Sequence, residues 1–94
     1  MSPKASKLLE RMRRSEANWK RADLDILYKK YGFEITHRTK HDSVKHPDFP
    51  QLRTMLPRHR KIAKAYVRIA VELVTELIRL QEEQGKSGEP DEQS

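Results

Sequence analysis

The spacing of apolar residues changes at Gly32, and this change limits the folds that the chain can adopt. Ahead of Gly32, apolar residues recur at the spacing of one buried helix face. These residues are Leu24, Leu27, Tyr28 and Tyr31. From Phe33 the period becomes two, so Phe33, Ile35 and His37 are expected on one face of a strand. Because glycine readily adopts the left-handed conformation that ends many helices, Gly32 marks the boundary between helix and strand.

Two further strands are predicted after this one. Thr39-Lys40 has the length of a tight connection, and residues 41–46 then form the second strand. Two prolines within residues 47–50 cannot donate ladder hydrogen bonds, so this segment is predicted to be a loop. Residues 52–56 form a short third strand, which ends at the proline that follows.

The last helix is predicted to run from about Arg60 to about Gln84. Its apolar residues form two adjacent stripes, Ile62, Tyr66, Ile69, Leu73, Leu77 and Leu80 beside Val67, Val71, Val74 and Ile78. One stripe is enough to cover a small sheet, so the second needs another cover. A helix that begins at Ser2-Pro3 and breaks at Asn18 is the first candidate. A homodimer formed through the last helix, or a partner protein, is the alternative.

These elements predict an α+β fold. A three-stranded antiparallel sheet is covered on one face by helices in the order α-β-β-β-α, with an extra N-terminal helix. That order is typical of double-stranded-RNA-binding domains. The boundaries expected are a helical extension over 1–18, a folded domain over 19–84 and a disordered acidic tail over 85–94. Trp19 is interpreted as an anchor for the N-terminal segment, with base stacking as the alternative.

Composition excludes several classes of protein. The chain has no cysteine, so neither a disulfide scaffold nor a thiolate metal site is available. Its first twenty residues lack the apolar core of a signal peptide, and no apolar run has the length of a membrane span. We therefore expect a soluble, cytoplasmic protein without a membrane partner.

The positive charge of the chain lies in its middle. The net charge is +6, but residues 36–68 hold nine Lys/Arg against Asp42 and Asp48, a balance of +7. Residues 1–35 carry +4 and residues 69–94 carry −5. A basic segment of this kind favours a polyanionic partner such as RNA, with a solvated surface as the alternative.

His41 lies within this basic segment. RNA contains its own nucleophile, the 2′-hydroxyl, so cleavage needs a group that moves protons and cations that offset phosphate charge. Histidine transfers protons near neutral pH, and Lys40, Lys45 and Arg38 are close to His41 in the sequence. The spacing of the four histidines argues against a metal site, and no cofactor is expected. His37 and His46 are expected in solvent or at the edge of the core.

Three runs of sequence resemble the HicA family of bacterial toxins. The first is Tyr-Gly-Phe-Glu-Ile, which ends a helix-then-strand segment over 23–35. The second is Lys-His-Asp-Ser-Val-Lys-His-Pro-Asp over 40–48, and the third is Met-Leu-Pro-Arg-His over 55–59. The resemblance covers about residues 20–80, and the leading helix with Asn-Trp resembles a longer subgroup of the family.

The resemblance implies a toxin of a toxin–antitoxin system, a metal-independent endoribonuclease that cleaves mRNA and is covered by a HicB-type antitoxin. It implies that His41 is the catalytic general acid/base. The family has Gly-Ser-His-His at this point, whereas the chain has Thr39-Lys40-His41-Asp42. If the strand alternates, Asp42 faces away from His41. A non-catalytic RNA-binding module of the same fold is therefore the alternative.

The residues expected to bind the RNA backbone are basic residues of the hairpin and of the N-terminal end of the last helix, where free backbone amides also favour anions. They are Arg38, Lys40, Lys45, Arg58, His59, Arg60, Lys61 and Lys64.

Overall fold

The computed structural model describes residues 3–88, and the side chains of residues 6–84. The elements are α1 (Pro3–Arg14), α2 (Arg21–Lys30), β1 (Glu34–His37), β2 (Asp42–Lys45), β3 (Arg53–Leu56) and α3 (Lys64–Gly88). The three strands form one antiparallel sheet in the order β1-β2-β3. The α+β class predicted from the sequence is therefore confirmed.

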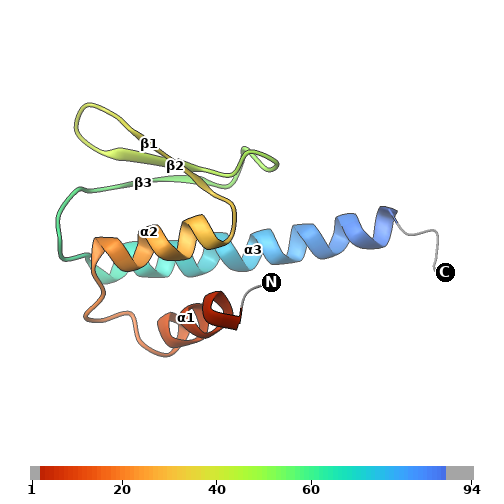
Figure 1. Ribbon diagram of the computed structural model, residues 1–94, viewed down its shortest axis with the longest axis horizontal. Helices are drawn as coiled ribbons and strands as arrows, with labels where there is room; N and C mark the ends of the chain where they lie inside the picture. The colour runs from red at the N-terminus through yellow and green to blue at the C-terminus, as the bar shows by residue number, and fades with distance from the viewer. Residues whose placement is uncertain (1–2, 89–94) are drawn as a thin grey trace.

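The molecule has three layers. Figure 1 shows the sheet on one side, α2 and α3 side by side along it, and α1 on the far side of these two helices. Helix α2 contacts β1 and α3 contacts β3, whereas α1 contacts only helices among the main packing contacts. The helices thus cover one face of the sheet, as predicted, and no helix in the described part of the chain covers the other face.

The boundary at Gly32 is confirmed. Gly32 has a φ angle of +88°, and the Phe33 N–H donates to the Tyr28 carbonyl at 2.9 Å. The left-handed residue reverses the chain at the end of α2, so β1 packs against the helix that precedes it. At the other end of α2, the Asp23 carboxylate accepts a hydrogen bond from the Lys20 N–H at 2.9 Å.

The β1–β2 connection is as tight as predicted. The Arg38 N–H donates to the His41 carbonyl at 3.1 Å, which closes the turn around Thr39-Lys40. In the register of the hairpin, His37 lies opposite Asp42. The two residues of each such pair point to the same face of the sheet.

Helix α1 covers the second apolar stripe of α3. Leu9 and Met12 are buried in the same core cluster as Val67 and Val74. The Arg13 guanidinium also donates to the Thr75 hydroxyl at 3.0 Å, so polar contacts join the same two helices. The prediction that the N-terminal helix packs on the last helix is confirmed, although its predicted first residue, Ser2, lies outside the described residues.

The predicted bounds of the last helix were wrong at both ends. Helix α3 begins at Lys64 rather than Arg60, because residues 60–62 pair with residues 19–21 instead. Lys20 and Lys61 form an antiparallel bridge, with hydrogen bonds from the Arg21 N–H to the Arg60 carbonyl and from the Ile62 N–H to the Trp19 carbonyl, at 2.9 and 3.2 Å. The helix also continues to Gly88, so residues 85–88 are helical and not the start of a tail; residues 89–94 lie outside the described residues.

Hydropathy adds one finding. Within residues 3–88, no helix combines the length and the apolar character needed to cross a membrane.

Candidate nucleic-acid interface

His41 lies in a hollow at the end of the β1–β2 hairpin. The hollow has a volume of about 520 Å³ and is lined by Arg38, Thr39, Lys40, His41, Ser43 and Met55. Met55 is 52% exposed and supplies an apolar surface beside the polar groups. Three of the predicted site residues, Arg38, Lys40 and His41, therefore line one space.

The hollow opens onto the uncovered face of the sheet. We call this the open face; it carries Glu34, Thr36, Ser43, Lys45, Arg53 and Met55. Lys45 is at the end of β2 remote from the hairpin turn, between Glu34 and Arg53 in the register, so it does not share the hollow of His41. Arg53, which was not predicted as a site residue, continues the positive charge along this face.

Asp42 faces the opposite side of the sheet from His41. Its side chain is 2% exposed, whereas His41 is exposed. The alternation expected from the sequence is confirmed. The carboxylate therefore does not put negative charge into the hollow.

The buried carboxylate of Asp42 binds three basic side chains. Arg21 Nη2 lies 2.6 Å from Oδ2, and Arg58 Nε and His37 Nδ1 each lie 2.9 Å from Oδ1. A buried carboxylate is costly unless charged or polar groups satisfy its oxygens. We call Asp42, Arg21, His37 and Arg58 the Asp42 cluster.

The cluster keeps Asp42 ionised. The hydrogen bond with His37 lowers the pKa of Asp42 most strongly, burial raises it, and the hydrogen bonds with Arg21 and Arg58 lower it again. The net result is a pKa well below the ordinary aspartate value. The cluster explains how a buried carboxylate is accommodated at position 42.

The Asp42 cluster also ties separate parts of the fold together. Arg21, on α2, donates to the Pro57 carbonyl at 2.9 Å and to Asp25 Oδ1 at 2.8 Å. Arg58, from the segment after β3, donates to the carbonyl of Arg38 in the hairpin. The cluster therefore joins α2, the hairpin and the segment that leads to α3.

His37 and Arg58 have roles that the sequence did not reveal. The His37 side chain is 80% exposed, yet its ring is oriented by the Asp42 carboxylate. Arg58, predicted to bind phosphate, is 46% exposed and uses part of its guanidinium within the protein. One signal was available: strand alternation places Asp42 on the buried face, where a carboxylate requires cationic partners.

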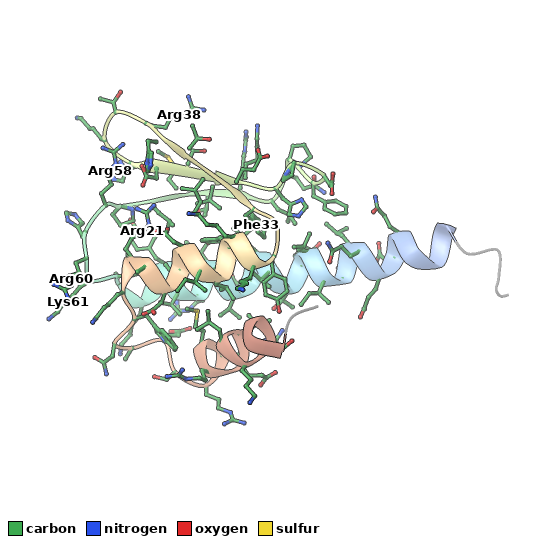
Figure 2. The ribbon with its side chains drawn as sticks, in the orientation of Figure 1. Arg21, Phe33, Arg38, Arg58, Arg60 and Lys61 are labelled. Carbon is green, nitrogen blue, oxygen red and sulfur yellow. The ribbon has the colours of Figure 1, made fainter. Side chains whose placement is uncertain are left out.

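The remaining predicted basic residues lie along one end of the molecule. Figure 2 shows Arg38, Arg58, Arg60 and Lys61 at the end that contains the hairpin turn and the start of α3. His59, Arg60 and Lys61 are exposed in the segment before α3, and Lys64 is the first residue of that helix. Only Lys64 belongs to the helix, so the other residues of the predicted cluster lie near the N-terminus of α3 in the segment before it.

His46 is a core residue and is not solvated. It is 3% exposed and lies between Phe33 and Phe49, with ring centroids 5.0 and 5.5 Å away. Its Nδ1 accepts a hydrogen bond from the Asp48 N–H at 3.1 Å. Among the residues that the structure describes, no group of three or more His, Cys, Asp or Glu side chains could hold a metal ion.

Comparisons with protein-family models, with curated proteins and with solved structures gave no match for this chain. The resemblance of the three short runs to the HicA family therefore stays a prediction. The features of the structure that bear on function are the hairpin, the open face and the basic end of the molecule, which carries Arg38, Arg58, Arg60 and Lys61 (Figure 2).

Proposed function

We propose that this protein binds RNA at the hairpin end and cleaves it as a metal-independent endoribonuclease, the toxin of a toxin–antitoxin system. One observation carries the proposal. The exposed imidazole of His41 shares a hollow with the guanidinium of Arg38 and the ammonium of Lys40. These are the chemical groups that cleavage by the RNA 2′-hydroxyl requires.

In this reaction, His41 acts as the general base and later as the general acid. Neutral His41 accepts the proton of the 2′-hydroxyl as the 2′-oxygen forms a bond to phosphorus. The bond from phosphorus to the 5′-oxygen breaks, and the leaving oxygen takes the proton from the imidazolium, which returns His41 to its neutral form. Arg38 and Lys40 offset the negative charge that develops on the phosphate. The products are a 2′,3′-cyclic phosphate and a 5′-hydroxyl, with no change in oxidation state.

The arrangement of cations supports an RNA partner. Arg38, Lys40 and Lys45 lie on the hairpin and the open face, and Arg60 and Lys61 lie at the same end as the turn. The order from α2 to α3, with helices on one face of a three-stranded sheet, supports a fold like that of double-stranded-RNA-binding domains. An mRNA would be the substrate, and a HicB-type antitoxin that covers the hollow would be the protein partner.

The proposal is tested by incubating the purified protein with mRNA in the presence of EDTA. Wild type is expected to cut, and His41→Ala is expected to lose cutting while its circular dichroism and melting temperature stay close to wild type. His37→Ala removes a second exposed histidine of the same hairpin that faces the other side and should keep cutting; because His37 also binds Asp42, its melting temperature is measured as well. Cutting retained in His41→Ala would overturn the role of His41.

A non-catalytic RNA-binding module is the second candidate. It is favoured by the composition of the hollow. Cleavage needs one group that accepts a proton and one that donates a proton, and a single histidine, His41, lines the hollow. Tight binding of RNA without any product in long incubations would select this function. Induced expression separates the two, because a toxin arrests growth and a binding module leaves growth unchanged.

A further inference from the structure

A second hollow lies at the basic end of the molecule, beside Trp19. It has a volume of about 420 Å³ and is lined by residues 17–20 on one side and residues 61–64 on the other. It shares no lining residue with the hollow of His41. The proposed cleavage makes no use of it.

The backbone holds the two sides of this hollow together. The bridge between Lys20 and Lys61 is flanked by hydrogen bonds of the Arg21 and Ile62 amides with the opposite segment. Asn18, with a φ of +66°, turns the chain into this pairing. The position of the lysines is therefore fixed by main-chain contacts.

The charges in this hollow are unbalanced. Lys20 and Lys61 are opposite each other in the bridge, an arrangement in which like charges repel. Lys64 also lines the hollow, and no carboxylate does. Lys64 is near Glu16, but the Glu16 carboxylate is bound by Arg68 at 2.9 Å. Within the described residues, neither Lys20 nor Lys61 forms an ion pair. An anion placed between these side chains would relieve the repulsion.

The indole of Trp19 is held in one orientation. Its Nε1–H donates to the Ser15 carbonyl at 2.8 Å, and the Arg11 guanidinium lies 5.3 Å from the ring centroid. Arg11 lines a neighbouring hollow and is not part of this one. Trp19 is only half-buried, and it is one of the residues that line the hollow of the three lysines. A rigid aromatic ring beside cations is the arrangement with which proteins bind single-stranded nucleic acid.

We propose that this hollow binds one nucleotide of single-stranded RNA, with the base against Trp19 and its phosphates held by Lys20, Lys61 and Lys64. The inference rests on the proposed function, because the RNA that enters here is the strand that reaches the hairpin. Arg60 and Arg58 lie between Lys61 and Arg38 along this end of the molecule (Figure 2) and would follow the backbone of that strand. The subsite thus extends the bound RNA beyond the cleavage site.

The only tryptophan of the chain gives a direct assay. Wild type is titrated with a fluorescein-labelled 2′-O-methyl oligouridylate of about 12 nucleotides, which lacks the 2′-hydroxyl needed for cleavage, and anisotropy and Trp19 fluorescence are recorded in parallel. Quenching of Trp19 is expected to saturate with the anisotropy curve. Trp19→Leu should weaken binding about tenfold, the loss expected for one stacked base. Lys20→Gln/Lys61→Gln keeps the indole and should make the negative slope of log affinity against log salt shallower by about 1.4.

Matched controls separate the outcomes. Lys29→Gln/Lys30→Gln removes the same charge from the end of α2 and should leave the quenching unchanged. Binding without quenching, with wild-type affinity in Trp19→Leu and in the Lys20/Lys61 variant, would overturn the subsite and leave the proposed function standing. An absence of RNA binding in the anisotropy of wild type would instead overturn the proposed function. Equal affinity and quenching with oligoglutamate would assign the hollow to an acidic peptide and overturn base recognition.

Discussion

Salt dependence gives a quantitative test of RNA binding at the hairpin end. Arg38 and Lys40 line the hollow of His41, and no ion pair with a carboxylate involves either side chain in the described part of the chain. Each phosphate contact of a single-stranded nucleic acid contributes about 0.7 to the slope of log affinity against log salt. The variant Arg38→Gln/Lys40→Gln should therefore have a negative slope that is shallower by about 1.4. Between about 50 and 200 mM salt, wild type should lose about sevenfold more affinity than this variant.

The assay is the anisotropy of a labelled single-stranded 2′-O-methyl RNA, which cannot be cleaved through its 2′-oxygen, measured over that range of salt. Lys29→Gln/Lys30→Gln is the control, because it lowers the net charge by the same amount at exposed positions on α2. General electrostatic attraction predicts equal slopes for the two variants. Contacts at the hairpin predict a shallower slope for the Arg38/Lys40 variant alone. Equal slopes would refute the placement of RNA phosphates in this hollow.

Two further predictions concern the stability of the site. The pKa of Asp42 is depressed in the folded state, so its contribution to stability is fully present above the ordinary aspartate pKa of about 3.9 and is lost as the pH falls below it. The melting temperature should thus fall in acid, and Asp42→Asn should be less stable at neutral pH with a weaker fall; an identical acid profile in Asp42→Asn would contradict this. Gly32→Ala should reduce the free energy of unfolding by about 1–2 kcal/mol, since a Cβ is strained at positive φ. The new Cβ would also lie 3.3 Å from His46 Nε2, and an unchanged urea midpoint would refute the strain.

The parts of the fold that the sequence predicted are those set by neighbouring residues. The switch from helix to strand at Gly32 and the turn at Thr39-Lys40 depend on local backbone preferences, so periodicity and turn length identify them. The cover of α3 by α1 could be predicted because two apolar stripes on one helix exceed what a small sheet buries.

The errors occurred where distant segments meet. Helix α3 starts late because the backbone of residues 60–62 is bound by residues 19–21, a pairing that helical periodicity does not report. The Asp42 cluster joins residues 16 and 21 positions apart in the sequence, so Asp42 looked like a departure from a motif rather than the centre of a network. His46 is buried because Phe33 and Phe49 enclose it, and only the fold brings these rings together.

The Asp42 cluster has a consequence for how the protein meets its ligand. Through Asp42 and the Arg38 carbonyl, Arg58 fixes the hairpin to the segment that carries Arg60 and Lys61. The segments that carry the two groups of cations are therefore held at a fixed separation, so the entropy cost of bringing these segments together arises in folding and not in binding. Under the proposed function, a strand of RNA would meet two groups of cations whose separation is already set, so one buried carboxylate would determine which separation of phosphates the surface selects.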